Sequence, residues 1–253
     1  MTTLISHFYN EQYLLPWWLM HHVPLFDHGI LINRGSTDHS LEMCRQFAPH
    51  WEVRHSRVPE FDPIQVDAEV MEIEKECAGW KMVLNTTEFL CCWDKQPFFD
   101  SLPLLGEQMY SIRTIVMVDP LNAGYPDPVY TVPLVKQRHH GYFPHDPNQP
   151  FIGRFIHKYG DGSYTPGRHW SPWPYRVYPS PAFILKFVFS PWNEAMRQRK
   201  LQIGPTLSSQ GKQLGLGTYH LTTKEQLEHT YLHFAGQTED LRLIPEYRQL
   251  GLL

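Results

Sequence analysis

The chain has 253 residues and a mass of 29.8 kDa, which is enough to bury a full hydrophobic core. Hydrophobic residues make up 42% and charged residues 19% of it, which is typical of a globular protein and excludes a disordered one. A formal net charge of −4 gives no electrostatic drive toward nucleic acid or an anionic membrane. No stretch approaches the ~20 apolar residues of a membrane span. Residues 1–10 carry no signal-like apolar run, so we expect a cytoplasmic protein.

The four cysteines are Cys44, Cys77, Cys91 and Cys92, and they form neither a CxxC pair nor a regular framework. Adjacent residues on a strand point to opposite faces, so a disulfide between Cys91 and Cys92 is not expected. Reduced thiols fit this pattern best.

The first ninety residues alternate between short apolar runs and amphipathic segments. The apolar runs predict strands over residues 3–8, 29–33, 51–58 and 80–84. The segments between them predict helices over 13–22, 40–47 and 62–78, the last with apolar residues at intervals of four, three and four. Strand–helix alternation predicts an α/β fold with a doubly wound, Rossmann-like mixed sheet.

Polar residues follow three of the predicted strands: Asn10-Glu11, the turn 33–38 and the run 85–88. Open α/β sheets bind ligands beyond the carboxyl ends of their strands. We therefore expect these three clusters to converge on one crevice.

The second half is less regular, and prolines and aromatic residues concentrate between residues 120 and 181. Strands are predicted over 112–118, 129–136 and 151–159, and a helix is expected to start at Ser190-Pro191. Thr222 and Glu225 form a capping-box pattern before a helix over 224–234. We expect one domain, 1–253, with a regular α/β first half (1–118) and an irregular second half (119–253). The proline-rich region is either a binding wall or a stiffened surface excursion.

Four motifs occur in a fixed order: HFYNEQYLLPWWLMHH at 7–22, FDH followed by NRGSTD at 26–38, Trp80 with NTTEFL at 85–90, and Gly-Arg-His at 167–169. Their order and spacing resemble GT-A fold glycosyltransferases of the family 2 type, especially the family 92 (DUF23-like) branch. The resemblance covers residues 3–90 and extends more loosely to about residue 205. It implies an inverting transferase that moves a sugar from a UDP- or GDP-linked donor to a glycan or other hydroxyl acceptor. Residues 1–118 would then be the nucleotide-sugar-binding half and residues 119–253 the acceptor-side half.

The resemblance also implies which side chains hold the nucleotide sugar. Asp38 matches the aspartate that contacts the base, although capping of the following helix would also explain it. The implied nucleotide-sugar-binding residues are Asn10, Glu11, Asn33, Asp38, Asn85, Thr87 and Arg168.

The family binds Mn²⁺ or Mg²⁺ through an Asp-x-Asp motif, whose aspartates are replaced here by Asn85 and Thr87. Hard divalent cations prefer carboxylate oxygens, so affinity for metal should fall. Glu88 and His169 remain as possible metal ligands. We expect that no cofactor is required, or that Mn²⁺ or Mg²⁺ binds weakly. Cations available to the leaving diphosphate are Arg154, Lys158, Arg168, Arg197 and Lys200.

An inverting transferase needs a carboxylate that deprotonates the acceptor hydroxyl. The alternatives are Glu107, Asp119 and Asp161, and no motif distinguishes among them. The aromatic stretch 170–178 suits either an acceptor sugar or the hydrophobic core.

Three other functions are alternatives to transfer. A catalytically inactive sugar- or nucleotide-binding protein derived from the GT-A fold is favoured by the missing aspartates. A nucleotidyltransferase needs a glycine-rich loop with a lysine, which FYNEQYLLP lacks. A metal hydrolase is disfavoured because the histidine pairs at 21–22 and 139–140 are adjacent and project to different sides.

Overall fold

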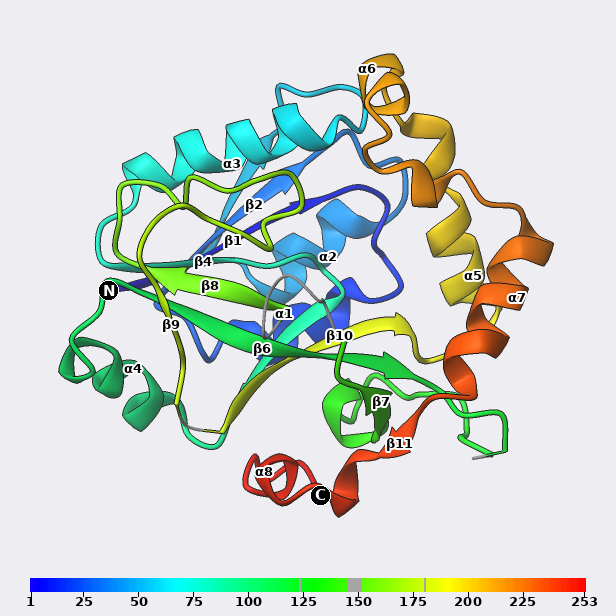
Figure 1. The fold of residues 1–253 in the computed structure, drawn as a ribbon. Coiled ribbons are helices and arrows are strands. Elements are labelled where there is room, and N and C mark those ends of the chain that lie inside the picture. Colours follow the sequence, from blue (N-terminus) through cyan, green and yellow to red (C-terminus); the bar gives the residue numbers. More distant parts are fainter. Residues whose placement is uncertain (123, 145–151, 180) are drawn as a thin grey trace.

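The computed structural model describes residues 1–122, 124–144, 152–179 and 181–253, which form a mixed sheet with helices on both faces (Figure 1). The elements are, in chain order, β1 (Thr2–Phe8), α1 (Leu15–His22), β2 (His28–Asn33), α2 (Ser40–Phe47), β3 (Glu52–His55), α3 (Pro63–Glu76), β4 (Trp80–Val83), β5 (Glu88–Cys92), α4 (Lys95–Leu104), β6 (Met109–Val118), η1 (Leu134–Lys136), β7 (His140–Tyr142), β8 (Gly153–His157), β9 (Arg176–Val177), β10 (Ala182–Phe189), α5 (Glu194–Leu201), η2 (Gly204–Thr206), α6 (Ser209–Gln213), η3 (Thr218–His220), α7 (Lys224–Ala235), β11 (Glu239–Asp240), η4 (Leu241–Leu243) and α8 (Pro245–Arg248).

The main path of the sheet has the strand order β11-β7-β6-β8-β4-β1-β2-β3. Strands β4, β1, β2 and β3 are mutually parallel, whereas β8 runs antiparallel between β4 and β6. Strand β10 lies parallel to the second half of β6 and antiparallel to β5. The predicted α/β class with a doubly wound mixed sheet is confirmed.

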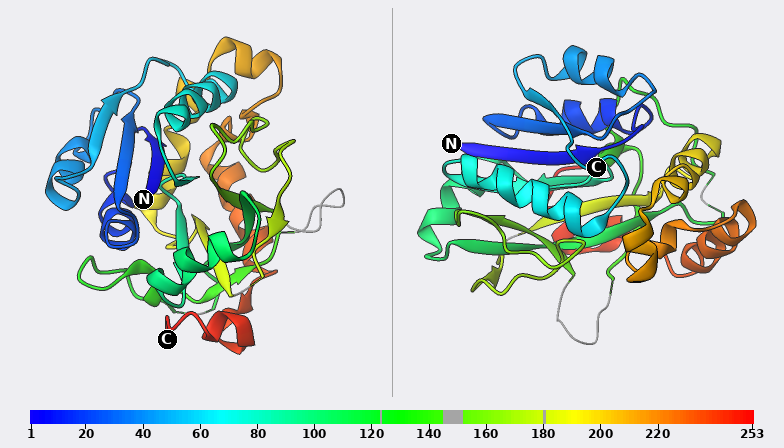
Figure 2. Two further views of the ribbon diagram at one scale, coloured as in Figure 1. Left: turned by 90° about the vertical axis from the view of Figure 1, so that its left-hand side faces the viewer. Right: turned by 90° about the horizontal axis from the view of Figure 1, so that it is seen from above.

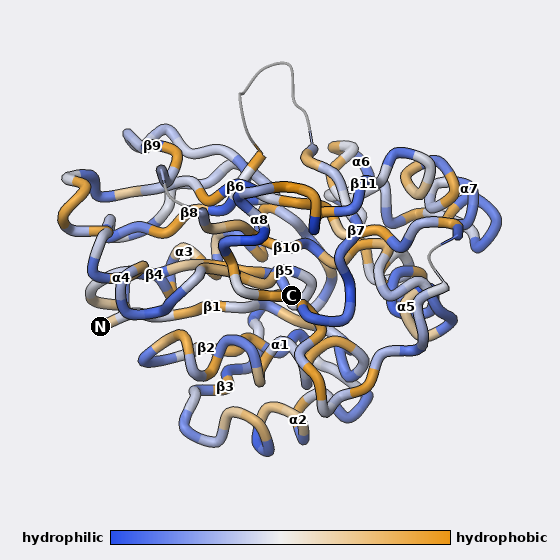
Figure 3. The backbone as a smooth tube through the Cα atoms, turned by 90° about the horizontal axis from the view of Figure 1, so that it is seen from below, coloured by the Kyte–Doolittle hydropathy of each residue, from blue (hydrophilic) through white to orange (hydrophobic). Residues whose placement is uncertain are grey.

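Two hydrophobic layers hold the sheet, because its parallel strands are buried on both faces. Ile5, Ile30 and Ile32 pack with Val70 and Ile73 of α3. The alternate strand residues face α1 and α2, where a larger cluster contains Trp17, Trp18 and Trp51. Figure 2 shows α2 and α3 on opposite sides of the strands. Figure 3 shows hydrophobic segments gathered centrally, with hydrophilic colour prominent in α5 and α7.

The predicted elements of the first ninety residues are all present, with ends shifted by a few residues. Helix α3 begins as expected, because the Asp62 carboxylate accepts hydrogen bonds from the N–H groups of Ile64 and Gln65, each 3.0 Å long. All four cysteines are free, and Cys91 is buried on β5. Strand β5 and helix α4 were not predicted.

Three predictions in the second half are wrong. Residues 129–136 are not a strand but a turn followed by η1, because the Gln137 side chain bonds the backbone of Val129 and Val132 and closes the segment. Helix α5 starts at Glu194 with Asn193 as its cap, and the Ser190 hydroxyl bonds Asp119 instead. The capping box before α7 is formed by Thr223 and Gln226, one residue later than expected. The predicted strand at 151–159 is β8, and its residue 151 lies outside the described residues.

Helices α5 and α6 and the turn η3 lie beyond the carboxyl ends of β1 and β2, on the right of Figure 1. Backbone hydrogen bonds of Phe61 with Thr206 and Ser208 attach this segment to the loop before α3. The C-terminal third of the chain therefore reaches the edge where the three polar clusters were expected to meet.

None of the helices that the structure describes is long and apolar enough to cross a membrane.

Gly29 on β2 tests the close packing of the sheet against α1 and α2. A Cβ atom added there would lie 2.0 Å from the indole ring of Trp51. We expect Gly29→Ala to lower the free energy of unfolding by roughly 3 kcal/mol, the upper range for overpacking a core. Gly160→Ala is the matched control, because nothing lies within 4 Å of its Cβ position. Urea unfolding curves of the two variants should differ clearly; equal stabilities would contradict this packing.

Candidate functional site

Glu88 occupies the centre of the carboxyl edge of the sheet, at the first residue of β5. Its side chain is fully buried. The carboxylate accepts a 2.9 Å hydrogen bond from the backbone N–H of Asn85, and its own N–H donates to the Asn85 carbonyl at 2.9 Å. The indole N–H of Trp18 donates to the Glu88 carbonyl oxygen at 2.9 Å. The turn 85–88 is thus closed on itself and fixed to α1.

Two cations neutralise the Glu88 carboxylate. Arg154 of β8 donates to both carboxylate oxygens, from Nε at 2.9 Å and from Nη2 at 2.7 Å. Lys186 of β10 places its Nζ 3.4 Å from Oε1. Burial opposes the charged form of Glu88, but these two cations and the bonds from Arg154 and Asn85 outweigh it and hold the pKa of Glu88 well below its usual range.

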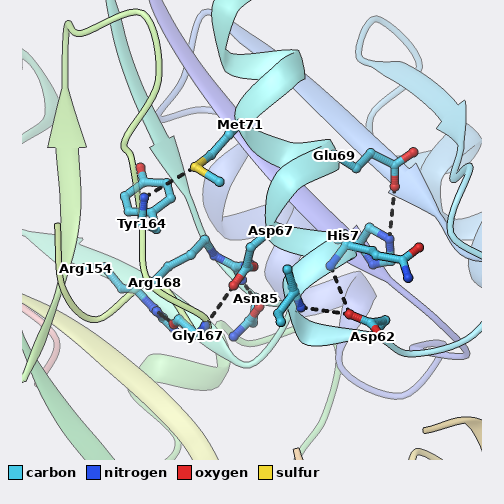
Figure 4. Close-up of polar contacts among 12 residues, drawn as sticks. His7, Asp62, Asp67, Glu69, Met71, Asn85, Arg154, Tyr164, Gly167 and Arg168 are labelled. Carbon is cyan, nitrogen blue, oxygen red and sulfur yellow. Dashed lines mark hydrogen bonds and ion pairs between the residues drawn. The ribbon is translucent and has the colours of Figure 1, made fainter. Parts of the chain in front are cut away.

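A second ion pair continues this layer beneath α3 (Figure 4). Arg168, which has a positive φ of 59°, pairs with Asp67 and donates to the Asn85 side-chain oxygen at 2.6 Å. The N–H of Gly167 donates to Asp67 at 2.8 Å, and the Gly167 carbonyl accepts from Arg154. The predicted Gly-Arg-His motif therefore meets the predicted 85–88 run.

His169 lies in the same layer and is kept neutral. Its Nδ1 is 3.3 Å from the carbonyl oxygen of Gly153, so Nδ1 carries the proton. The positive charge of Arg154, together with burial, lowers the pKa of His169 to about 2.

These donors do not fit a divalent metal site. The Glu88 carboxylate is already bound by Arg154, Lys186 and a backbone N–H, and the Asn85 oxygen is held by Arg168. Within the described ranges, no group of three His, Cys, Asp or Glu side chains could hold a metal ion. A guanidinium occupies the place that a metal would need beside Glu88.

The two N-terminal polar clusters, Asn10-Glu11 and the turn 33–38, also reach this edge and are joined there by hydrogen bonds. The side-chain oxygen of Asn10 accepts a 2.8 Å hydrogen bond from the Thr37 N–H. The side-chain oxygen of Asn33 accepts a 2.9 Å hydrogen bond from the Ser36 N–H. Asp38 accepts from the N–H groups of Gln12 and Ser40, both at 3.0 Å. Asp38 therefore joins the start of α2 to the loop after β1, although His39 is the N-cap residue and α2 has no side-chain cap. Nucleotide contact through Asp38 stays a prediction.

Helix α5 brings two further cations to this edge. Arg199 forms a bidentate pair with Glu11, whose backbone N–H donates to Ser40. Lys200 follows, with its Nζ 4.3 Å from the centre of the Phe189 ring. We call the charged side chains on this edge the cation cluster. It consists of Arg154, Arg168, Lys186, Arg199 and Lys200, with the carboxylates Glu11, Asp67 and Glu88.

Several predicted residues lie elsewhere. Glu107 precedes β6 and Asp161 follows β8, at the amino-terminal edge of the parallel strands, where they pair with Arg176 and Lys75. Lys158 lies at that edge as well, over Trp80, and Arg197 faces α7 through Glu228. The structure does not bring these residues to the cation cluster.

Asp119 is the general-base alternative that does lie at the carboxyl edge. It follows β6, and its N–H donates to the carbonyl of Phe189. The ring of Phe189 contacts the ammonium group of Lys200. Its carboxylate accepts from the Ser190 hydroxyl at 2.5 Å and the Trp192 N–H at 2.8 Å, and Arg138 lies 3.3 Å away.

The aromatic stretch 170–178 divides between surface and core. Tyr178 packs on Phe98 and Tyr110 inside the protein. Trp173 is 41% exposed and stacks on Tyr159, with its indole N–H on the Asp161 carbonyl. Trp173 therefore lies toward the amino-terminal edge, away from the cation cluster.

Lys186, Arg199 and Asp67 belong to the site but were not predicted. Lys186 left a usable signal, because a single lysine interrupts the apolar run AFILKFVF at 182–189. A charged residue inside a buried strand is rare unless it is paired. Arg199 and Asp67 left none, because each sits among other charged residues on a helix.

Comparison with known proteins gives partial overlaps. No protein-family model and no curated protein matches the chain. Among solved structures, S. aureus TarS 1–349 in complex with UDP-GlcNAc matches at 11% identity and a TM-score of 0.39, covering 81% of this chain and 66% of that one. M. tuberculosis glucosyl-3-phosphoglycerate synthase in complex with Mn²⁺, UDP and glucosyl-3-phosphoglycerate matches at 14% identity and 0.36, covering 62% and 56%. The chain spans between 23% and 66% of the length of such structures.

Arg154 tests the ion pair at the centre of the site. We expect Arg154→Met to lower the free energy of unfolding by about 3 kcal/mol, because it leaves a buried carboxylate with only Lys186. Adding Glu88→Gln should recover most of this loss, since the amide needs no counter-charge. Arg176→Met is the control, because that arginine is 74% exposed in its pair with Glu107, and such pairs contribute less than about 1 kcal/mol. Thermal or urea unfolding measures the natural protein, the two single site variants, the double variant and the control. Additive effects of the two site substitutions would contradict the pairing.

Proposed function

We propose that this protein is a glycosyltransferase that moves a sugar from a UDP- or GDP-linked donor to a glycan or other hydroxyl acceptor, without requiring a bound divalent metal. The observation that supports this most is the pairing of Glu88 with Arg154 and Lys186 at the position of the resembled family's metal motif. A positively charged layer lies there, beside the polar turns of β1 and β2. The location is the ligand edge of an open α/β sheet.

Protein cations can supply the electrostatic part of this reaction. The acceptor oxygen forms a bond to the anomeric carbon as the bond from that carbon to the phosphate oxygen breaks, and the nucleoside diphosphate leaves with the electron pair. Fixed positive groups stabilise the charge that develops on the leaving diphosphate. The acceptor's proton passes to a carboxylate, and attack opposite the leaving group inverts the anomeric centre.

We propose Asp119 as that carboxylate, because it alone of Glu107, Asp119 and Asp161 lies at the carboxyl edge of the sheet. Its N–H donates to the carbonyl of Phe189, and Lys200 lies over the ring of the same residue. Its hydrogen bonds from Ser190 and Trp192 hold it in one orientation, which a general base needs.

A catalytically inactive binding protein is the second candidate function. It is favoured by the pairing of all three general-base alternatives with arginine or lysine. Such a protein would bind a nucleotide sugar through the same cations but would never release the free nucleotide. Release of nucleoside diphosphate in the presence of acceptors separates the two.

Donor binding should not require a metal. We expect calorimetry in EDTA to detect binding of at least one member of a panel of UDP- and GDP-sugars, with an affinity that changes less than about threefold when Mn²⁺ replaces EDTA. Cationic side chains stay in place whether or not metal is present, which is the reason for this result. Binding of no nucleotide at millimolar concentration would refute transfer, and binding that strictly needs Mn²⁺ would refute the metal-free account.

Removing the proposed base, Asp119, should lower the turnover number kcat. We expect Asp119→Asn to reduce kcat for transfer by roughly 10²–10⁴-fold, the usual contribution of a general base, with little change in the donor KM. Glu107→Gln and Asp161→Asn are matched controls, because each neutralises one paired carboxylate at the other edge. Initial-rate kinetics measures the three variants, with circular dichroism to confirm folding. A normal kcat for folded Asp119→Asn would eliminate this residue as the base.

A further inference from the structure

We infer that the loop between β8 and β9 carries a second, non-catalytic site, in which Trp173, together with Trp170, binds the pyranose rings of an uncharged glycan. We call these two side chains the tryptophan platform. It lies toward the amino-terminal edge of the parallel strands, at the opposite edge from the cation cluster. The inference goes beyond the proposed function, because glycan binding at the platform needs neither the sugar donor nor the transfer step.

Trp173 has a fixed indole ring with one free face. Its other face stacks on the Tyr159 ring, with the ring centres 5.1 Å apart and the planes inclined by 21°. The indole N–H donates to the Asp161 carbonyl oxygen at 3.1 Å, and the backbone N–H donates to the Ser171 hydroxyl at 3.2 Å. Trp173 nevertheless remains 41% exposed. Because the ring is already supported and its N–H is bonded, the exposed apolar face is preorganised for a ligand.

The loop beneath the platform is anchored to α3 through Glu74, whose side chain is fully buried. The Glu74 carboxylate accepts hydrogen bonds from the Gly162 N–H at 2.7 Å and from the Tyr164 hydroxyl at 2.8 Å. The Tyr164 N–H contacts the sulfur of Met71 at 3.3 Å (Figure 4). The Ser171 hydroxyl closes the loop by donating to the Gly162 carbonyl at 2.6 Å. Binding to a base held in this way orders few additional groups and therefore loses little conformational entropy.

A pair of opposite charges borders the free indole. The Lys75 ammonium lies 3.3 Å from Oδ2 of Asp161, and these side chains are 59% and 23% exposed. Asp161 also holds the indole N–H of Trp173 through its carbonyl oxygen, so the pair lies at the rim of that ring. The carboxylate accepts hydrogen bonds and the ammonium donates them, and a sugar hydroxyl can do both. The two charges cancel, so this rim suits an uncharged polyol better than an anion.

The flat apolar face and the polar rim together identify the kind of sugar. A pyranose ring with equatorial hydroxyl groups, as in β-linked glucose or N-acetylglucosamine, presents C–H groups on each face and hydroxyls around its circumference. The C–H groups pack on the negative face of an aromatic ring, and the hydroxyls meet the rim. Trp170 is 48% exposed on the same loop, where its carbonyl accepts from the Thr165 N–H at 3.1 Å. A second exposed indole three residues away favours a chain of sugars over a single one.

A protein partner fits this surface less well. Hot spots of protein interfaces lie in well-packed pockets ringed by contacts that exclude water. The free face of Trp173 is instead bordered by the exposed Lys75 and by the Asp161 carboxylate.

The experiment is fluorine NMR of the protein labelled with 5-fluorotryptophan, titrated with cellohexaose and with chitohexaose. We expect the Trp173 resonance, identified by its absence from Trp173→Ala, to shift with at least one of these glycans at millimolar concentration. Calorimetry with the same glycan should show that Trp173→Ala weakens binding roughly tenfold, as expected for the loss of one aromatic stacking contact. Trp170→Ala should weaken the same glycan by a smaller factor.

Two further variants keep the result interpretable. Trp173→Tyr keeps an aromatic face and should bind the glycan within about threefold of the natural protein. Trp93→Ala is the matched control, because Trp93 is 58% exposed but follows β5, outside this loop, and its removal should leave glycan affinity unchanged. Circular dichroism confirms the folding of each variant.

The inference would be overturned if neither glycan shifted the Trp173 resonance, or if folded Trp173→Ala bound the glycan as tightly as the natural protein. A dimer in sedimentation velocity that Trp173→Ala dissolves would also overturn it, because a second copy of the chain would then cover the platform. Binding of a nucleotide sugar without binding of either glycan would leave the proposed function standing and eliminate the platform. Glycan binding through Trp173 without binding of any nucleotide sugar would sustain the platform and overturn the proposed function.

Discussion

The buried pair of Glu88 with Arg154 organises the functional edge of this protein. Removing a carboxylate from water is costly, and only close cations and hydrogen bonds compensate for it. Arg154, Lys186 and the Asn85 N–H provide that compensation from β8, β10 and the turn before β5. Three segments distant in sequence are therefore held at fixed positions by one carboxylate, and the orientation of Gly167 follows because its carbonyl accepts from the same arginine.

The C-terminal segment completes this edge through polar contacts with each N-terminal loop. Gln202 donates to the Asn10 carbonyl at 2.6 Å, Arg199 pairs with Glu11, and Ser208 donates to Asp62 at 2.7 Å. Arg34 reaches Thr206 at 3.0 Å and lies over the Tyr9 ring. These contacts attach the segment that carries Arg199 and Lys200 to the N-terminal loops, so the cation cluster depends on docking of α5 as much as on the sheet.

The strands and helices of the first ninety residues could be predicted because their apolar periodicity and turn residues are local signals. Strand β5 was not predicted, because its first residues belong to the motif at 85–90, which was interpreted as a polar cluster at the end of the preceding strand. Residues 129–136 were misassigned because the Gln137 side chain determines their turn. The meeting of 85–88 with 167–169 was anticipated only through the family resemblance. The partner of Glu88 could not be predicted, because Arg154 is one of several basic residues in an irregular region and only the β8 register places it there.

In the proposed function, protein cations stand where the resembled family places a metal ion. Diffraction from crystals grown with UDP and Mn²⁺, measured at the manganese absorption edge, tests this most directly. We expect a diphosphate within hydrogen-bond distance of basic side chains of the cation cluster, with no anomalous peak between it and Glu88. A manganese peak coordinated by Glu88 or His169, with Arg154 displaced from the carboxylate, would contradict it.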